Sequence, residues 1–348
     1  MSTRAVHQAP AARNQAPAML PVTDVVSIAD LGPAGVQLAL ELASLIKARP
    51  SEFRTALAGK QLVLMFEKPS LRTRLTFEVG IAEMGGTSFF IDHRGERMSE
   101  REPVRDIARN LERWIDGVVL RTYEHATVTD MAEFASIPVI NALSDMEHPC
   151  QALADFLTLQ EKFGDLRKVK LTYVGDGNNV AHSLVLAAAC VGASIAIATP
   201  AGYGPNADIV KRACAIARDT GANIEVLSDP EAAVAAADAV YTDVWASMGQ
   251  EEEGEARRKI FAAFQVNDGL MSCAKSGALF MHCLPAHRGD EVTGSVLESP
   301  VSVVFDQAEN RLHAQKAVLL MLFSDGVGRF VARKKSKTPA RGWRNAHA

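Results

Sequence analysis

A polar segment with two arginines follows a short apolar run near residue 70. Residues 67–74 read EKPSLRTR, and residues 62–66 before them read LVLMF. Pro69 biases the residue before it away from a helix, and Ser70 is a good N-cap for the periodic apolar residues that follow. A capped helix start offers free backbone N–H groups and a positive dipole end, to which Arg72 and Thr73 add donors. The segment therefore predicts a phosphate site, with an ordinary helix start and surface arginines as the alternative.

Arg72 and Arg74 are two residues apart and cannot share one face of a helix. We expect one of them to meet the ligand and the other to pair with an acid of the chain. Further candidates stand where other apolar runs end, namely Arg121, Asp243 and Cys283. Taken alone, an arginine at such a place is most often a surface charge, and a cysteine there is often a packing residue.

The segment HPCQ at residues 148–151 predicts another helix start, because proline suits the first helical turn. His148 would then stand at the cap and Gln151 one turn on. A helix N-terminus disfavours the protonated imidazole, so His148 is expected to act as a neutral hydrogen-bond donor. The bland alternative is a structural histidine.

Gly175 and Gly177 fit the first half of a dinucleotide-binding fingerprint, followed by Asn179. The third glycine position of that fingerprint holds Val180, so the match is weak. An NAD-dependent dehydrogenase is the alternative that this motif raises. It leaves the phosphate cradle near Ser70 unexplained.

Alternating strand-like and helix-like segments must position these residues. Apolar, β-rich runs predict buried strands at residues 62–66, 87–91, 116–121 and 137–141, and further strands at residues 169–175, 193–199, 222–227, 238–243 and 278–283. Helical patterns lie between them at residues 70–84, 103–113, 126–136, 149–163, 179–190, 205–219, 230–236 and 251–264, with a last helix at roughly 308–332. Apolar strands spaced by helices indicate parallel sheets covered on both faces. The predicted fold class is α/β, with two doubly wound parallel-sheet domains joined by bridging helices.

Composition excludes several classes of protein. The 348 residues carry a net charge of −4, which does not favour a general nucleic-acid binder, and no apolar run approaches the ~20 residues of a membrane span. The five cysteines show no C-x-x-C spacing, so we expect neither a disulfide scaffold nor a zinc ribbon, and we expect a reducing, cytoplasmic setting. Residues 1–23 contain no acid and two arginines. An organelle signal and a disordered tail both remain open for that segment, and its prolines and lack of amphipathic pattern favour the tail.

Five motifs occur in a fixed order: SLRTR, HPCQ, DGNN, D-x-x-x-SMG and HCLP. Together they resemble the ornithine carbamoyltransferases, and the resemblance runs from about residue 26 to residue 331. S-x-RTR with HP-x-Q is typical of the transcarbamoylase superfamily at large. D-x-x-x-SMG with HCLP is more specific to the ornithine branch.

The resemblance implies transfer of a carbamoyl group from carbamoyl phosphate to the δ-amine of L-ornithine, giving L-citrulline and phosphate, in arginine biosynthesis. It makes Arg121, His148 and Cys283 the catalytic residues. It places carbamoyl phosphate on Ser70, Leu71, Arg72, Thr73, Arg97, Arg121, His148, Gln151, Cys283, Leu284 and Arg311. It places L-ornithine on Asn179, Asp243, Ser247 and Met248.

The resemblance further implies a homotrimer with active sites between subunits, and neither a metal nor a cofactor. The domains it implies are a tail at 1–25, a carbamoyl-phosphate domain at 26–150, an ornithine domain at 151–310, a returning helix at 311–332 and a basic tail at 333–348. Two positions depart from the family pattern. Leu71 stands where the family usually has threonine, and Arg97 stands where a loop often contributes glutamine or histidine to a neighbouring subunit.

Two further alternatives concern the ligand. A sister enzyme would carbamoylate aspartate, putrescine or N-acetylornithine. An aspartate site should add cations for a second carboxylate, whereas Asp243 and Ser247 offer an acid and a hydroxyl for an ammonium. A non-catalytic binding protein is the last alternative, and the chemically competent residues at each motif position count against it.

Overall fold

The computed structural model describes residues 22–93, 96–246 and 254–324. Residues 22–324 form one compact unit. Its first sheet has four parallel strands, in the spatial order β2 (Thr87–Asp92), β1 (Gln61–Phe66), β3 (Gly117–Arg121) and β4 (Val139–Leu143). The predicted parallel α/β arrangement is confirmed here.

The edge strand β2 departs from the sequence prediction. Its apolar residues predicted a buried strand, but Phe89 and Ile91 are 49% and 41% exposed. Among the described residues, the strand is paired on one side only, with β1. The prediction of a strand here is confirmed, and the prediction that it is buried is wrong.

Helices connect these strands: α1 (Ile28–Ala48), the 3-10 turn η1 (Pro50–Phe53), α2 (Leu71–Glu83), α3 (Met98–Arg101), α4 (Val104–Leu111) and α5 (His125–Phe134). The sequence analysis did not predict α1. Its start carries a capping box. The Ser27 hydroxyl accepts a hydrogen bond from the backbone N–H of Asp30, and the Asp30 carboxylate accepts one from the backbone N–H of Ser27. Gly32, at φ 59°, and Pro33 then interrupt the helix near its start and mask its periodicity.

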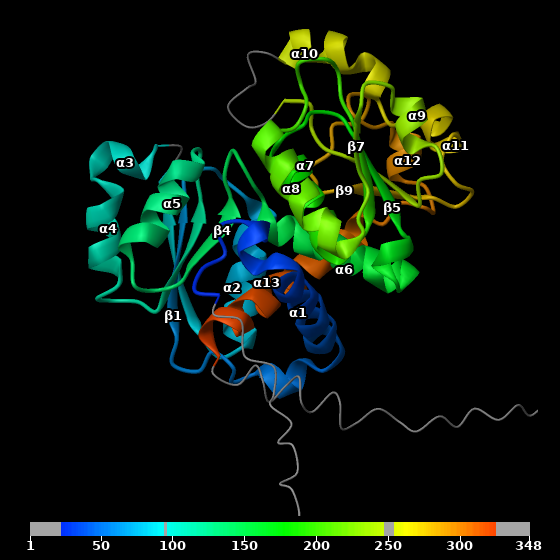
Figure 1. Ribbon diagram of the computed structural model, residues 1–348. Helices are drawn as coiled ribbons and strands as arrows, with labels where there is room; N and C mark the ends of the chain where they lie inside the picture. Colours follow the sequence, from blue (N-terminus) through cyan, green and yellow to red (C-terminus); the bar gives the residue numbers. More distant parts are fainter. Residues whose placement is uncertain (1–21, 94–95, 247–253, 325–348) are drawn as a thin grey trace, which may run out of the picture. The chain divides into compact units, whose positions relative to one another are not determined.

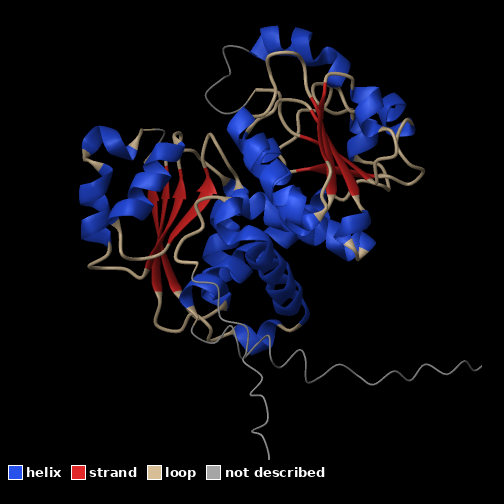
Figure 2. Cartoon of the chain, in the orientation of Figure 1, coloured by secondary structure: helices blue, strands red, loops and turns tan. Residues whose placement is uncertain are grey.

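The second sheet has five parallel strands, in the spatial order β7 (Ile224–Leu227), β6 (Ser194–Ala198), β5 (Lys170–Val174), β8 (Ala239–Thr242) and β9 (Leu279–His282). Its helices and 3-10 turns are α6 (Pro149–Phe163), η2 (Leu166–Lys168), α7 (Asn179–Val191), α8 (Ala207–Thr220), α9 (Pro230–Val234), α10 (Gly254–Phe261), η4 (Ala262–Phe264), α11 (Asp268–Ser272) and α12 (Gly294–Leu297). Figure 2 shows helices on both faces of each sheet. The doubly wound prediction is thus confirmed for both sheets.

The last described helix, α13 (Val304–Phe323), packs against α1, α2 and α6 and also contacts β9. Figure 1 shows it in orange beside the dark blue α1. At Gly80 of α2, an added Cβ would lie 3.2 Å from Cγ of Lys316, so glycine allows the two helices to approach closely. The predicted helix at 308–332 is corrected at both ends, since the chain turns extended at Ser324 and the residues beyond lie outside the described part.

The predicted domain boundaries after residues 150 and 310 fall inside α6 and α13, and the domain division stays a prediction. The two tails lie almost entirely outside the described residues. Within the described ranges, none of the helices combines the length and apolar character needed to cross a membrane.

Candidate active site

Each sheet contains a point where the chain reverses the direction in which it adds strands. In the first sheet β2 and β3 lie on opposite sides of β1, and in the second β6 and β8 lie on opposite sides of β5. Open parallel sheets bind ligands outside the carboxyl ends of their strands at such points. The residues after β1, β3, β5 and β8 are therefore the ones that should meet a ligand.

A cavity of about 480 Å³ lies where these segments meet. It is lined by twelve of the predicted residues: Ser70, Leu71, Arg72, Thr73, Arg121, His148, Gln151, Asn179, Asp243, Cys283, Leu284 and Arg311. The structure thus brings both predicted groups, the anion-binding residues and the amine-binding residues, into one space.

Three predicted residues are not among the lining residues. Arg97 precedes α3, and its guanidinium lies 3.3 Å from the carboxylate of Glu124, with both side chains half exposed. Ser247 and Met248 lie outside the described residues. The contributions of these three residues stay predictions.

The start of α2 has the form expected of a phosphate cradle. The Ser70 hydroxyl accepts a hydrogen bond from the backbone N–H of Thr73, at 3.2 Å, which confirms the predicted N-cap. Arg74 turns away, with Nε 3.1 Å from Glu78 Oε1 and its guanidinium 3.7 Å from the centre of the Phe90 ring. Arg72 is therefore the arginine of this pair that lines the cavity.

Arg311 reaches the cavity from α13 and connects two other elements. It donates to Oε1 of Gln151 at 2.5 Å and to Oγ1 of Thr73 at 2.9 Å. Its Nε is buried with no hydrogen-bond partner among the described residues. The guanidinium is thus fixed by neutral partners and keeps its charge available to an anion.

Arg121 ends β3 beside this group and is buried. Burial, together with the positive charges of Arg311 and Arg72, lowers its pKa to about 9. Burial also lowers the pKa of Arg311. Cations held together at such a cost stabilise a bound anion strongly, because its charge offsets their repulsion.

His148 stands at the N-cap position of α6, and its backbone N–H donates to Oγ of Ser183 at 2.9 Å. Burial, followed by the charges of Arg311 and Arg121, lowers the pKa of His148 well below its usual value. The expected neutral imidazole is therefore supported, although burial and two cations cause it rather than the helix end. Its Nδ1 is buried and has no partner within the described part of the chain.

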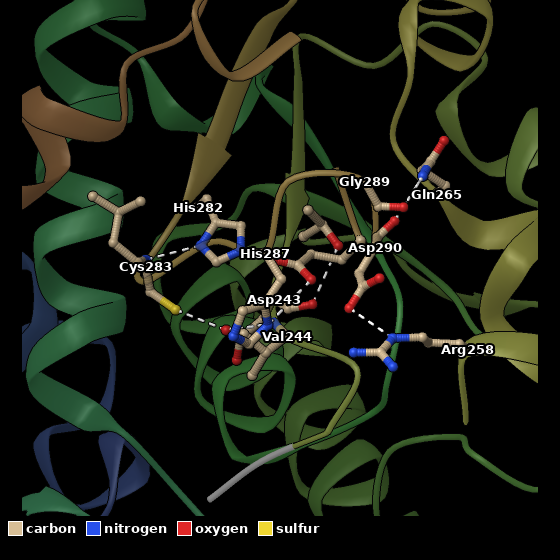
Figure 3. Close-up of polar contacts among 12 residues, drawn as sticks. Asp243, Val244, Arg258, Gln265, His282, Cys283, His287, Gly289 and Asp290 are labelled. Atoms are coloured by element: carbon tan, nitrogen blue, oxygen red, sulfur yellow. Dashed lines mark hydrogen bonds and ion pairs between the residues drawn. The ribbon is translucent and has the colours of Figure 1, made fainter. Parts of the chain in front are cut away.

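One wall of the cavity carries an acid, Asp243. One oxygen of Asp243 accepts from the Cys283 thiol at 3.0 Å (Figure 3) and from the N–H of Val244 at 2.8 Å. The other oxygen accepts from the Asn178 amide at 2.8 Å. Asn178 also caps α7 through its side-chain oxygen. A carboxylate held at both oxygens is oriented in advance to receive an ammonium group.

Burial, and then the neighbouring charge of Asp243, raises the pKa of the Cys283 thiol well above its usual range. Cys283 is therefore a neutral thiol at pH 7, and it donates a hydrogen bond rather than acting as a thiolate base. We expect iodoacetamide at pH 7.5 to modify Cys283 at least about tenfold more slowly than the exposed Cys214 and Cys273. Peptide mass spectrometry over a time course measures the rates, and equal labelling of all three would contradict the assignment.

Asn179 begins α7 on the same side of the cavity. Its amide already donates to the backbone oxygen of Ser144 at 2.5 Å. The predicted contact with a carboxylate therefore requires the second N–H of this amide or release of Ser144. Spacing in the sequence gave no sign of this bond.

Three side chains offer atoms that could hold a metal ion, since those of Asp243, His282 and Cys283 lie within 4.8 Å of one another. Each is already used in a hydrogen bond. His282 accepts from the N–H of Leu284 at 2.8 Å and faces Glu291 at 3.3 Å, while Cys283 bonds Asp243. We therefore give this group a hydrogen-bonding role.

Sequence reasoning missed two polar residues of the cavity, Lys68 and His287. Lys68 lies two residues before Ser70, and its ammonium lies 4.7 Å from the centre of the Tyr123 ring. His287 follows Cys283 by four residues in the same loop. Their places next to predicted strand ends were the available signal.

The two parallel sheets present arginines and an acid to one cavity, a lining that suits an anion and an amine. Sequence models of the aspartate/ornithine carbamoyltransferases match nearly all of the described chain. The carbamoyl-P binding domain matches residues 23–161, and the Asp/Orn binding domain matches residues 167–322. The chain belongs to the aspartate/ornithine carbamoyltransferase family, and it is a carbamoyltransferase.

Individual ornithine carbamoyltransferases are similar to this chain over most of its length. The chain is 50% identical over 301 residues to the ornithine carbamoyltransferase of Pyrococcus abyssi, covering 86% of this chain and 95% of that one. It has the same identity over 301 residues to the anabolic ornithine carbamoyltransferase of Pyrococcus furiosus. The structure of ornithine carbamoyltransferase from P. furiosus superposes with a TM-score of 0.84 at 49% identity, covering 87% of this chain and 97% of that chain.

The dehydrogenase alternative is excluded by this membership, and the structure gives the glycine turn a different cause. A Cβ at Gly177 would lie 2.3 Å from the backbone nitrogen of Pro205. The glycine is therefore needed because another loop of the chain packs against it. The binding-protein alternative is excluded along with the dehydrogenase.

Proposed function

We propose that this chain is an ornithine carbamoyltransferase, which transfers the carbamoyl group of carbamoyl phosphate to the δ-amine of L-ornithine in arginine biosynthesis. One observation carries the choice of acceptor: the acidic Asp243 wall shares a cavity with the arginine-rich phosphate cradle. An α-ammonium binds the acid, and the extended side chain carries the δ-amine toward Cys283.

The phosphate group binds the start of α2 through Ser70, Thr73 and the backbone N–H of Leu71, with Arg72 as its counter-charge. The carbamoyl oxygen receives hydrogen bonds from Arg121 and neutral His148. Gln151, Arg311 and the backbone oxygens of Cys283 and Leu284 complete the carbamoyl pocket. Asn179, Ser247 and Met248 complete the ornithine site with Asp243.

In the reaction, the neutral δ-amine attacks the carbonyl carbon. A C–N bond forms, the bond from carbon to the phosphate oxygen breaks, and one amine proton is released. Negative charge grows first on the carbonyl oxygen and then on phosphate, and fixed cationic and neutral donors stabilise both. Positioning and electrostatics thus supply the catalysis that these residues provide.

Citrulline formation tests the proposal. The protein is mixed with carbamoyl phosphate and, separately, with ornithine, lysine, putrescine, N-acetylornithine and aspartate, and each carbamoylated product is quantified by mass spectrometry. We expect ornithine to exceed every other amine in kcat/KM. Equal or faster turnover of another amine would transfer the assignment to a sister enzyme.

Arg72→Ala is expected to weaken carbamoyl phosphate binding by about 10²-fold, because it removes a charge-assisted contact of roughly 3 kcal/mol. Ornithine should bind the preformed complex with nearly unchanged affinity. Isothermal calorimetry with carbamoyl phosphate measures the first effect. An unchanged affinity would show that the phosphate does not lie at the start of α2.

We also propose a homotrimer. Leu71, Leu75 and Val79 form an exposed apolar stripe at four-residue spacing on α2, which contacts β2 with its exposed Phe89 and Ile91. Exposed apolar patches of this kind are typical of protein interfaces. Leu71 also lines the cavity, so a second copy of the chain seated on this face would reach the active site.

Arg97 is expected to serve the active site of a neighbouring subunit. Mixing Arg97→Ala and Arg72→Ala proteins under subunit-exchange conditions should then restore part of the activity, because some hybrid sites contain both intact arginines. Sedimentation tests for the trimer, and the citrulline assay measures recovery of activity. Mixtures that recover nothing would place Arg97 at its own subunit's site or at none.

We also propose that the protein is located in the cytoplasm. All five cysteines are free, including the exposed Cys214 and Cys273, which fits a reducing compartment.

A further inference from the structure

Asp155 is a fully buried carboxylate of α6 that does not line the cavity. It accepts three hydrogen bonds from three elements. Gln151 donates to its Oδ1 at 2.8 Å, Gln307 of α13 donates to the same oxygen at 2.9 Å, and the Tyr241 hydroxyl of β8 donates to Oδ2 at 3.1 Å.

Two of these partners lead directly to the active site. Gln151 accepts from Arg311, which also holds Thr73 of the phosphate cradle. Gln307 accepts, at 3.0 Å, from the backbone N–H of His282, the residue before Cys283. The third, Tyr241, lies two residues before Asp243.

The chemistry of the donors fixes the direction of each amide. An ionised carboxylate only accepts, whereas a guanidinium and a backbone N–H only donate. Each glutamine must therefore turn its NH₂ to Asp155 and its oxygen to the active-site partner. One buried carboxylate thus determines the orientation of groups on both sides of the cavity.

We infer that Asp155 is a positioning residue that holds the carbamoyl phosphate subsite and the ornithine subsite in register. This role rests on the proposed function for the identity of the two ligands. The residue touches neither ligand and acts through Gln151, Gln307 and Tyr241.

Leucine and asparagine at this position separate geometry from charge. Asp155→Leu removes every acceptor at similar volume. Asp155→Asn keeps an oxygen for both glutamines, while its NH₂ faces the Tyr241 hydroxyl, which can accept. Positioning by hydrogen bonds therefore predicts a large loss in the leucine variant and partial rescue in the asparagine variant.

Thr158→Val is the matched control. Thr158 is fully buried one turn further along α6 and accepts from Asn310 of α13 at 3.0 Å, so this variant also loses a bond between the two helices. Neither Thr158 nor Asn310 lines the cavity.

The experiment compares full-length wild type and variants below their melting temperatures. For Asp155→Leu we expect kcat to fall about 10²-fold, the loss typical of a misplacement near 1 Å. We expect its affinity for inorganic phosphate, measured by calorimetry, to fall about tenfold, since Arg311 and Thr73 are no longer held in place. Asp155→Asn should stay within about tenfold of wild type in kcat, and Thr158→Val within about threefold.

Gln307→Met gives a second test that does not depend on the leucine variant folding. It removes the hydrogen bonds that link Asp155 through Gln307 to the backbone of His282, and it leaves those through Gln151 intact. We therefore expect a higher KM for ornithine and a lower kcat, with unchanged affinity for phosphate. The inference is overturned if Asp155→Leu matches Thr158→Val, if Asp155→Asn is as impaired as Asp155→Leu, or if Gln307→Met changes phosphate affinity as much as ornithine kinetics. A wild type that binds phosphate but forms no citrulline would instead refute the proposed function.

A pH profile adds a readout that a purely structural role would not change. Burial raises the pKa of Asp155 to about 6, against the three hydrogen bonds. Three ionisable groups face Asp155. Burial raises the pKa values of Tyr241 and Cys283 well above their usual ranges, and the guanidinium of Arg311 stays protonated near neutral pH. All three therefore keep their protonation state between pH 5 and 8. The ratio of wild-type to Asp155→Asn kcat should fall as pH drops through about 6, because only the aspartate gains a proton and loses an acceptor. A ratio that is constant over this range would contradict the positioning role.

Discussion

Replacing Arg121 with glutamine is expected to lower kcat by about 10²–10³-fold, the usual loss when one donor to a developing oxyanion is removed. The same change is expected to raise thermal stability. Arg121 has a folded-state pKa of about 9, below its usual 12.5, so its charge destabilises the folded chain at pH 7. Removing that charge should raise the melting temperature by several degrees, since 1 kcal/mol corresponds to roughly 1.5 °C for a unit of about 300 residues.

Calorimetric melting and steady-state kinetics on the same preparation measure both effects. Arg105→Gln is a suitable control, because Arg105 is exposed and pairs only loosely with Asp106, at 3.9 Å. It should change neither quantity appreciably. If the Arg121 variant loses stability along with activity, the arginine contributes mainly to structure.

Asp243→Asn is expected to remove the preference for ornithine. A buried ammonium that loses its charged partner costs about 3–5 kcal/mol, so kcat/KM for ornithine should fall about 10²–10³-fold. 5-Aminopentanoate has the carboxylate and the reacting amine of ornithine but no α-ammonium, so it should lose less, and the ratio of ornithine to 5-aminopentanoate turnover should approach one. The wild type should prefer ornithine to lysine by at least about 10²-fold, because one extra methylene displaces the amine from the carbonyl.

Asp238→Asn is the matched control for this variant. Asp238 precedes the opposite end of β8 and pairs with Lys275 at 2.7 Å, away from the cavity. The discrimination between amines should be unchanged in it. A preserved ornithine preference in Asp243→Asn would mean that another group recognises the α-ammonium.

The strands were predictable because parallel strands buried on both faces leave long apolar runs, and the polar residues after them mark one edge of each sheet. The exposure of β2 was not predictable, since an apolar edge strand and a buried strand have similar composition. The α1 helix was missed because Gly32 and Pro33 break its pattern near the start. The local sequence indicates whether a segment forms a strand or a helix. The tertiary contacts of that segment determine how far it is buried.

The cavity was predictable only in part, for a related reason. Motif positions identified twelve of its lining residues through family resemblance. The bond that links Arg311 to Thr73 joins residues 238 positions apart. Asp155 lies in no motif segment and has the composition of an ordinary helical acid. Its role depends on Gln307 and Tyr241, which only the folded chain brings to it.

The packing of α13 on α2 also bears on how the active site forms during synthesis. A ribosome adds roughly 5–20 residues per second, so α13 follows α2 by roughly 10–50 s. During that interval Thr73 has no Arg311 and Glu83 has no Lys316, and the surface of α2 at Gly80 faces solvent. The first sheet therefore lacks part of its helical layer during synthesis. The phosphate cradle is complete only after α13 has been synthesised and has packed against α2.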